Sequence, residues 1–197
     1  MPIDADALRR RFARAEPPRD TIYGDQGARA EAAELTAASV LVPIVLREAG
    51  LTVLFTRRTA ELKNHSGQIS FPGGRAEPDD PGPEHTALRE TQEEIGLADE
   101  RIELLGRLAD YHTRTGYRIT PVVGLVTPPF ELTPDPHEVD EVFEVPLPFL
   151  LDPANHQRHA REFQGEIRHF FAIPWGEYYI WGATAGMLVN LHRLVSG

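Results

Sequence analysis

The chain of 197 residues contains no cysteine. This absence excludes disulfide bonds, zinc sites built on thiolates and cysteine nucleophiles. The sequence also lacks an apolar run long enough to cross a membrane. Its first residues, MPIDADALRRRFARAEPP, lack the long apolar core of a signal peptide. We therefore expect a cytoplasmic protein that has no membrane as a partner.

Basic residues are in the minority, because 20 lysines and arginines stand against 30 aspartates and glutamates, a formal net charge of −10. Nucleic-acid binding needs a basic face, so this balance argues against nucleic acid as a partner. An acidic protein can still bind a phosphorylated small molecule when metal cations lie between the two. The length and the apolar content of 41% fit one globular body with a full core.

The most informative segment spans residues 67–97, GQISFPGGRAEPDDPGPEHTALRETQEEIGL. Apolar and polar residues alternate over 68–71, which predicts a short half-buried strand. The Pro-Gly-Gly at 72–74 predicts a sharp turn that stops this strand. Pro83 suits the first position of a helix, and Gly96 suits its C-terminal cap. The segment therefore predicts a strand, a glycine turn, an acidic loop and a helix.

Three carboxylates lie close together on the predicted helix. Glu90, Glu93 and Glu94 are spaced i, i+3 and i+4, so they fall roughly on one face. Apolar and small side chains are expected on the opposite face: Leu88, Thr91 and Ile95. Gathering three negative charges costs stability, and a hard divalent cation such as Mg²⁺ or Mn²⁺ would offset that cost. A solvated acidic helix face is the alternative for such a spacing taken alone.

Strands and helices alternate irregularly along the rest of the chain. Strands are expected at 39–46, 51–56, 102–108, 119–126, 167–173 and 177–180, and helices at 4–15 and 181–195. Residues 139–145 are expected to form a short helix or turn. Residues 16–36 look like a loose arm that either wraps the body or joins a neighbouring subunit, which leaves a homodimer open. The pattern favours an α/β (α+β) fold with a mixed sheet covered by helices on both sides.

The residues from Gly74 to Leu97 resemble the Nudix box, whose helix has the pattern Arg-Glu-U-x-Glu-Glu-x-Gly-U with U apolar; here it is RETQEEIGL from Arg89. Thr91 departs from the pattern at an apolar position. The segment from Gly74 to Arg89 is one residue longer than in the pattern, and Asp80 stands where a glutamate is usual. The upstream residues 54–58, Leu62, His65 and 67–74 are similar to the coenzyme A pyrophosphatase branch, which has a longer acidic loop of this kind.

The resemblance extends from about residue 38 to about residue 191 and implies the Nudix fold, an α/β/α sandwich. We expect a hydrolase domain at 37–197 preceded by an N-terminal helix and arm at 1–36. The implied reaction is metal-dependent hydrolysis of the diphosphate linkage of coenzyme A and its derivatives, giving 3′,5′-ADP and 4′-phosphopantetheine or its acyl form. ADP-ribose, a dinucleotide or another nucleoside diphosphate derivative is the alternative substrate. A non-catalytic Nudix-like module is a third hypothesis, although it has no need of all three glutamates.

The resemblance also implies roles for residues of the box. Glu90 and Glu94 are expected to bind Mg²⁺ or Mn²⁺, together with Gly74 through its carbonyl oxygen. Glu93 is expected to be a third ligand or to orient the attacking water. Arg89 is assigned to the catalytic group, where its guanidinium is expected to hold a carboxylate rather than touch substrate.

Phosphate groups of a coenzyme A substrate would need basic partners near the helix. The residues expected to bind substrate are Arg57, Lys63, His65, Arg75 and Arg114; His65 is equally suited to capping its loop.

Two further choices stay open in the sequence. Asp80 either braces the acidic loop or is an exposed turn residue. The acidic group Glu138, Asp140 and Glu141 either supplies a general base or favours the N-terminus of the helix expected there.

Overall fold

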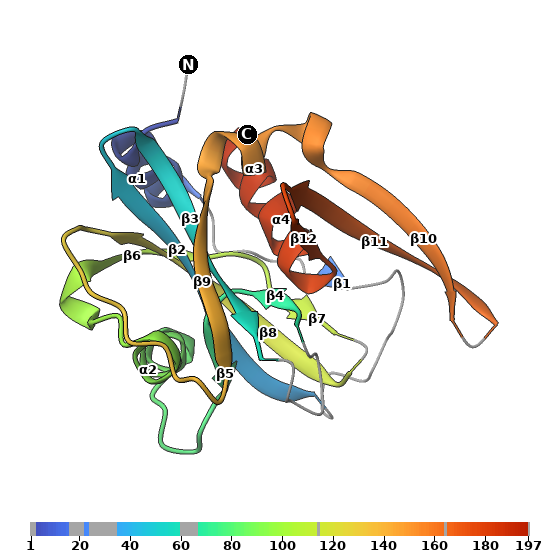
Figure 1. The fold of residues 1–197 in the computed structure, drawn as a ribbon, viewed down its shortest axis with the longest axis horizontal. Helices are drawn as coiled ribbons and strands as arrows, with labels where there is room; N and C mark the ends of the chain where they lie inside the picture. Colours follow the sequence, from blue (N-terminus) through green and yellow to red (C-terminus); the bar gives the residue numbers. More distant parts are fainter. Residues whose placement is uncertain are drawn as a thin grey trace.

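The protein is described by a computed structural model that covers residues 3–15, 22–23, 35–59, 67–113, 115–163 and 165–196 (Figure 1). The helices are α1 (Ala5–Arg14), α2 (Pro83–Ile95), α3 (Leu147–Leu151) and α4 (Ala183–Ser196), with 3₁₀ turns η2 (Asp99–Arg101) and η3 (Pro153–Asn155). The strands are β1 (Ile22–Tyr23), β2 (Thr36–Arg47), β3 (Gly50–Arg58), β4 (Ile69–Ser70), β5 (Gly73–Arg75), β6 (Ile102–Arg107), β7 (Tyr111–His112), β8 (Tyr117–Val126), β9 (Val139–Pro146), β10 (Gln157–Phe163), β11 (Glu166–Trp175) and β12 (Tyr178–Trp181).

A mixed sheet forms the centre of the molecule. Its main order is β1-β7-β8-β2-β3-β4, and β5, β6 and β9 pair with β2, β8 and β3. Strands β2 and β8 run parallel over ten residue pairs, whereas β2 and β3, expected as strands at 39–46 and 51–56, form an antiparallel hairpin. A second sheet has the order β10-β11-β12, and its strands β11 and β12, expected at 167–173 and 177–180, pair antiparallel. The expectation of a mixed sheet is therefore confirmed.

Apolar side chains of the central strands alternate between two cores. On β2, Val42 and Ile44 belong to a core that also contains residues of α1 and α4. Leu41 and Val45 of the same strand point to the opposite side, where they pack in smaller clusters with Ala87 or Ile95 of α2. A strand buried on both faces needs a continuous apolar run, which explains the sequence VLVPIVL at 40–46. The sheet is thus sandwiched between α2 on one face and α1 with α4 on the other (Figure 1).

The helix α2 begins and ends where the sequence predicts. Pro83 occupies the first turn, and Gly96 caps the C-terminus with a left-handed backbone, φ 70°. Thr91, the exception in the apolar pattern, is buried, and its hydroxyl donates to the carbonyl oxygen of Ala87 at 2.6 Å. The unusual residue is therefore satisfied within the helix.

Two predicted elements are wrong. Residues 72–74 do not simply turn, because Gly73 opens strand β5, which pairs with β2. A Cβ atom at Gly73 would lie 2.3 Å from the carbonyl oxygen of Ser39, so glycine is needed for this close approach. Residues 139–145 form no helix but the strand β9, which pairs antiparallel with β3. The pairing partner lies more than eighty residues earlier in the chain, out of reach of a local pattern.

The ends of the chain show one confirmed helix and two smaller differences from the sequence prediction. Helix α1 is confirmed, with Asp4 accepting a hydrogen bond from the amide of Ala7 at 2.7 Å. Strand β10 has no counterpart in the sequence prediction, and Trp181 belongs to β12 rather than to the final helix. Within the described residues, no helix combines the length and the apolar character that crossing a membrane requires.

Candidate metal and hydrolysis site

The loop before α2 is fixed by Asp80. Its carboxylate accepts hydrogen bonds from the amide of Glu77 at 2.9 Å and the hydroxyl of Thr86 at 2.8 Å. Arg89 donates to the same carboxylate from Nε at 3.2 Å and from Nη2 at 3.1 Å. The guanidinium holds the pKa of the Asp80 carboxyl well below its usual range. Of the two alternatives for Asp80, the structure supports the brace.

Arg89 connects the loop to the carboxylates of α2. Its Nη1 lies 2.9 Å from Glu90 Oε1 and 3.0 Å from Glu93 Oε2, and its Nη2 donates to the carbonyl oxygen of Arg75 at 3.1 Å. The side chain is only 17% exposed. These contacts join the guanidinium to three carboxylates and a backbone carbonyl oxygen, so Arg89 holds acidic side chains in place.

Glu94 lies on the buried side of α2, contrary to the expected polar face. Its side chain is 5% exposed and accepts a hydrogen bond from the Gly73 amide at 3.2 Å. Arg58 Nη1 stands 3.6 Å from the other carboxylate oxygen. Burial raises the pKa of Glu94 to about 8, and these two contacts offset only part of that rise. A cation beside this group would lower its pKa and favour the ionised carboxylate.

Glu90 lies against Gly74, which follows Gly73 in strand β5. A Cβ atom at Gly74 would come within 2.3 Å of Glu90 Oε2, so any side chain there would collide with the carboxylate. Glu90 is 18% exposed, and burial raises its pKa despite the neighbouring Arg89. The glutamates of α2 at positions 90 and 94 therefore both face the glycine backbone of β5.

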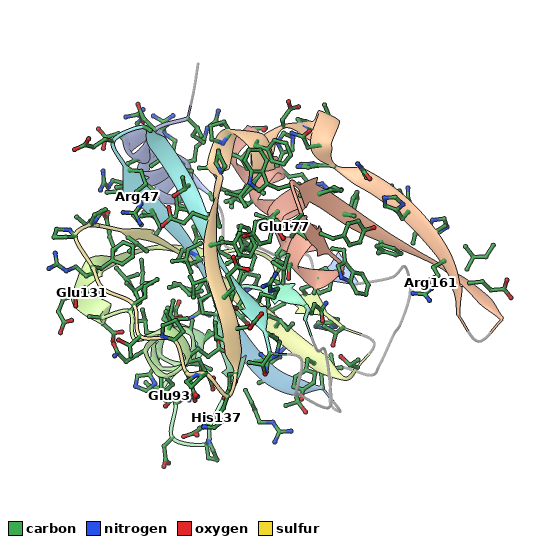
Figure 2. All side chains as sticks on the ribbon, in the orientation of Figure 1. Arg47, Glu93, Glu131, His137, Arg161 and Glu177 are labelled. Atoms are coloured by element: carbon green, nitrogen blue, oxygen red, sulfur yellow. The ribbon has the colours of Figure 1, made fainter. Side chains whose placement is uncertain are left out.

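Glu93 shares the Arg89 guanidinium with Glu90 but faces solvent. Its side chain is 59% exposed and lies at the periphery of α2 (Figure 2). Within the described residues, no three histidine or acidic side chains are grouped closely enough to hold an ion by themselves. Mg²⁺ is commonly held by only one or two carboxylates, with waters and substrate phosphates completing its shell. Glu90, Glu94 and the backbone at Gly74 fit that description as hard oxygen donors.

Glu138, one of the three acidic residues that the sequence left open as a general base, lies close to Glu94. Its carboxylate lies 3.6 Å from Arg58 Nη2, and the same guanidinium approaches Glu94. The charge of Glu138 contributes to the raised pKa values of both Glu90 and Glu94. The residue reaches this place because Arg58 of β3 pairs with Val139 of β9. The strand pairing, rather than a helix terminus, explains its position.

A cleft of about 570 Å³ opens beside the two glycines. Arg58, Gly73 and Gly74 line it at the side of the glutamates. The rest of the lining is mostly apolar or hydroxylic, with one amide and one further arginine: Ala38, Val40, Gln68, Ser70, Phe71, Arg75, Thr113, Thr115, Tyr117, Ile119, Ala183, Thr184 and Met187. The carboxylates therefore stand next to a space that suits a small molecule with both polar and apolar parts.

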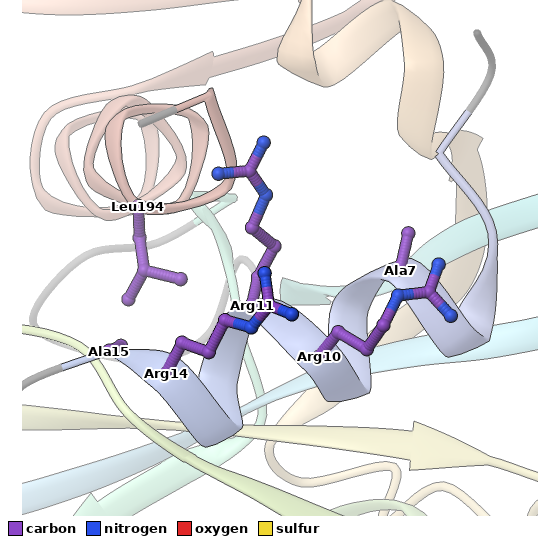
Figure 3. A pocket seen from close by; sticks show the side chains of 6 residues that line it. All are labelled: Ala7, Arg10, Arg11, Arg14, Ala15 and Leu194. Atoms are coloured by element: carbon purple, nitrogen blue, oxygen red, sulfur yellow. The ribbon is translucent and has the colours of Figure 1, made fainter.

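A second cavity of similar volume lies between α1 and α4 (Figure 3). Its lining includes Arg10, Arg11 and Arg14 together with Ala7, Ala15 and Leu194, and it contains no carboxylate. A cation would be repelled by these three guanidinium groups. The cleft at the glycines is therefore the better candidate for metal-dependent chemistry.

The expected substrate residue Arg57 is engaged elsewhere. Its guanidinium pairs with Asp140 at 3.1 Å and with Glu141 at 3.0 Å, both on β9. Tyr178 donates its hydroxyl hydrogen to the same Glu141 at 2.7 Å. This network fastens β9 to β3 and to the second sheet. Arg57 does not line the cleft, and its acidic partners are occupied rather than free to act as bases.

The remaining expected substrate residues divide into two groups. Arg75 has an exposed side chain and lines the cleft, as a phosphate partner should. Lys63, His65 and Arg114 lie outside the described residues. Arg58, which belongs to the upstream motif 54–58, also lines the cleft.

Comparison with known proteins agrees with this geometry. The family model of the NUDIX domain matches residues 35–165. A protein of Photorhabdus laumondii named "Uncharacterized Nudix hydrolase NudL" is 37% identical over 158 residues, which are 80% of this chain and 84% of the relative. A protein of the same name from Yersinia pestis is 39% identical over 161 residues, covering 81% and 79%.

Solved structures show the same fold. The Nudix hydrolase RenU from M. smegmatis superimposes with a TM-score of 0.51 at 22% identity, over 68% of this chain and 83% of that one. A MutT/nudix family protein from Enterococcus faecalis has a TM-score of 0.52 at 15% identity, over 98% and 70%. With its matching domain model, its relatives and its fold, this chain belongs to the Nudix family and is a Nudix hydrolase.

Proposed function

We propose that this Nudix hydrolase cleaves the diphosphate linkage of coenzyme A and its derivatives, with Mg²⁺ or Mn²⁺ as cofactor. The products would be 3′,5′-ADP and 4′-phosphopantetheine or its acyl form. The observation that carries the proposal is the pair Glu90 and Glu94. Burial raises the pKa of both carboxyl groups, nearby arginines offset only part of that rise, and both face the glycine backbone beside the cleft. The coenzyme A part rests on the similarity of residues 54–74 and of the long loop to the coenzyme A pyrophosphatase branch.

In this proposal Glu90, Glu94 and the carbonyl oxygen of Gly74 hold the cation. Once bound, a divalent ion would neutralise phosphate charge and lower the pKa of a water molecule. Arg89 keeps the Glu90 carboxylate turned toward the glycines. Arg58 supports Glu94 from the other side, so both ligands are oriented before the ion arrives.

Proton removal from the attacking water needs another group. Glu93 and Glu138 are the two candidates, at opposite sides of the buried pair. Glu93 is held by Arg89 and is exposed, whereas Glu138 shares Arg58 with Glu94. We propose that Glu93 or Glu138 removes the proton of the attacking water. We expect the variants Glu93→Gln and Glu138→Gln to differ in the pH dependence of kcat.

The cleft predicts a small molecule as the partner. We propose a cytoplasmic enzyme that binds neither nucleic acid nor membranes, with its hydrolase domain at residues 37–197. Arg75 at the cleft would contact a phosphate of the substrate, and Lys63, His65 and Arg114 remain proposed partners of the same kind.

A substrate panel tests the specificity. Purified protein with Mg²⁺ is given coenzyme A, acetyl-coenzyme A, ADP-ribose, a dinucleoside polyphosphate and a nucleoside triphosphate. We expect kcat/KM for coenzyme A or its acetyl form to exceed all others by at least about tenfold, a difference of about 1.4 kcal/mol. A preference for ADP-ribose would contradict the coenzyme A assignment and leave the metal site standing.

The metal assignment has its own test. We expect Glu90→Gln and Glu94→Gln each to lower kcat by about 100-fold or more, because each removes a charged ligand of the cation. Glu100→Gln is the matched control, since Glu100 is exposed in the 3₁₀ turn η2. Circular dichroism would check that all three variants fold. Full activity in both box variants would overturn the assignment.

A further inference from the structure

The second sheet exposes a free strand edge. Strand β11 pairs with β10 on one side and with β12 on the other, so β10 is the outermost strand. In Figure 1 the β10–β11 hairpin extends away from the central sheet. Within the described part of the chain, no strand pairs with the outer side of β10. Unpaired strand edges are templates for pairing with another chain.

Two of the devices that usually block such pairing, a proline and a β-bulge, are absent from β10, whereas a third, charged side chains, is present. Its seven residues contain no proline, and their register with β11 runs without a bulge from Gln157 opposite Ala172 to Phe163 opposite Glu166. The central residue, Ala160, is exposed and small. The exposed side chains that flank it are charged, namely Arg158, Arg161 and Glu162.

We propose that two copies of this chain associate through β10, paired antiparallel with the β10 of the other copy around a two-fold axis at Ala160. Two-fold antiparallel pairing places residues of equal parity opposite each other. With Ala160 on the axis, Arg158 faces Glu162 of the partner subunit, and Glu162 faces the partner's Arg158. The single edge therefore supplies two ion pairs, one on each side of the axis.

The charge pattern selects this register over its neighbours. A centre at Arg161 would place two like charges directly opposite each other, which destabilises a strand pair. A centre at His159 would leave Arg158 facing an alanine. The register at Ala160 alone among the three pairs opposite charges and also uses all seven residues of the strand.

Apolar side chains accompany the edge. Ile167 of β11 stands opposite Glu162 and is 71% exposed. On the other face His159 stacks on Phe170, with ring centroids 5.7 Å apart, and Phe170 meets Trp181 at 5.4 Å. Pairing of two edges would join both three-stranded sheets into one, and it would remove part of this apolar surface from water.

A charge-swap experiment tests the interface on the full-length protein. We expect analytical ultracentrifugation to show a dimer that weakens as salt increases. Arg158→Glu and Glu162→Arg should each raise the dimer dissociation constant by at least about tenfold, because each turns two attractive pairs into repulsive ones. The double variant R158E/E162R should return to within about threefold of the wild type by the same pair energies.

A control and the contrary results complete this test. Glu48→Arg changes the same charge in the exposed β2–β3 turn and should leave the dissociation constant unchanged. The proposal is overturned if the wild type stays monomeric at about 100 μM, a concentration at which an interface with a micromolar constant is occupied. Single reversals that leave a wild-type dimer intact would also overturn it.

Disulfide cross-linking offers an independent measurement, because the chain has no cysteine of its own. Opposite residues on an antiparallel pair have Cα atoms about 4.5–5.5 Å apart, within the span of a disulfide. Ala160→Cys should therefore give a disulfide-linked dimer under mild oxidation, whereas Ala49→Cys in the distant turn should not. Equal cross-linking of both variants, or none at position 160, would contradict a two-fold axis at Ala160. Neither result bears on the hydrolysis reaction.

Discussion

At the scale of residues, two neighbouring glutamates show how position on one helix determines the burial of a carboxylate. Glu94 is 5% exposed and Glu93 is 59% exposed, although both belong to the same box. One step along a helix turns the side chain by about 100°, which here separates the buried face from solvent. A buried carboxylate resists ionisation, so Glu94 holds its proton more tightly in the folded chain, whereas the Glu93 side chain faces solvent.

The raised pKa of Glu94 predicts a pH-dependent stability. The pKa is about 8 in the folded chain without metal and about 4.3 when unfolded. The folded state thus holds the proton more tightly, and its stabilising contribution is full below pH 4.3 and lost as pH rises through 8. In EDTA we expect the free energy of unfolding of the wild type, relative to Glu94→Gln, to fall by up to about 1.4 kcal/mol per pH unit over pH 5–8.

Mg²⁺ should reverse this behaviour. The cation binds the deprotonated carboxylate, so added Mg²⁺ should stabilise the wild type more at pH 8 than at pH 6. Urea denaturation at each pH, with Glu100→Gln as a matched variant, provides the measurement. Identical pH slopes for the wild type and Glu94→Gln in EDTA would refute the raised pKa.

At the scale of elements, the acidic loop and α2 behave as one unit. Asp80 receives hydrogen bonds from the loop backbone, from Thr86 and from Arg89, which in turn holds Glu90. The longer loop of this chain therefore does not loosen the helix. Its charge is used to hold the guanidinium that orients the candidate metal ligand.

Replacement of Asp80 should destabilise both the acidic loop and the helix α2. We expect Asp80→Asn to lower the free energy of unfolding by about 2 kcal/mol, because Arg89 loses a charge-assisted bidentate partner while largely buried. For a protein of this size the melting temperature should fall by about 5 °C. Calorimetry of Asp80→Asn beside Asp79→Asn, the exposed neighbour in the same loop, would measure the effect. Equal melting temperatures of the two variants would show that the brace contributes nothing.

At the scale of the whole molecule, the N-terminal helix belongs to the main body. Leu8 is fully buried and Phe12 is 8% exposed, and both join the core that contains Leu188 of α4. The family model ends at residue 165 and begins at residue 35, so it includes neither helix. The face of the sheet opposite α2 is nevertheless covered by these two flanking elements.

Removal of one aromatic ring tests this dependence. We expect Phe12→Ala to lower the free energy of unfolding by about 3 kcal/mol, as large-to-small changes in a core do. Arg10→Ala on the exposed side of α1 should change it by less than about 0.5 kcal/mol. A small effect of Phe12→Ala in urea denaturation would mean that α1 is an appendage and that residues 37–197 are stable alone.

The sequence by itself determined the central helix α2 and the positions of the glutamates along it. Pro83 and Gly96 mark the ends of α2 through local backbone preferences, which need no tertiary partner. The alternation and the apolar runs of β2, β3 and β8 were likewise predictable, because each strand is buried on both faces. The spacing of Glu90, Glu93 and Glu94 alone left a solvated helix face as the alternative, and the resemblance to the Nudix box favoured a metal site.

Only the tertiary structure decided which carboxylates meet. The burial of Glu94 depends on where β5 lies, and β5 exists because Gly73 lets two backbones approach closely. Glu138 reaches the site through the pairing of β9 with β3, between residues more than eighty positions apart. The free edge of β10 likewise follows from the order of strands in a sheet. Such contacts depend on packing across the whole chain, and no short stretch of sequence contains them.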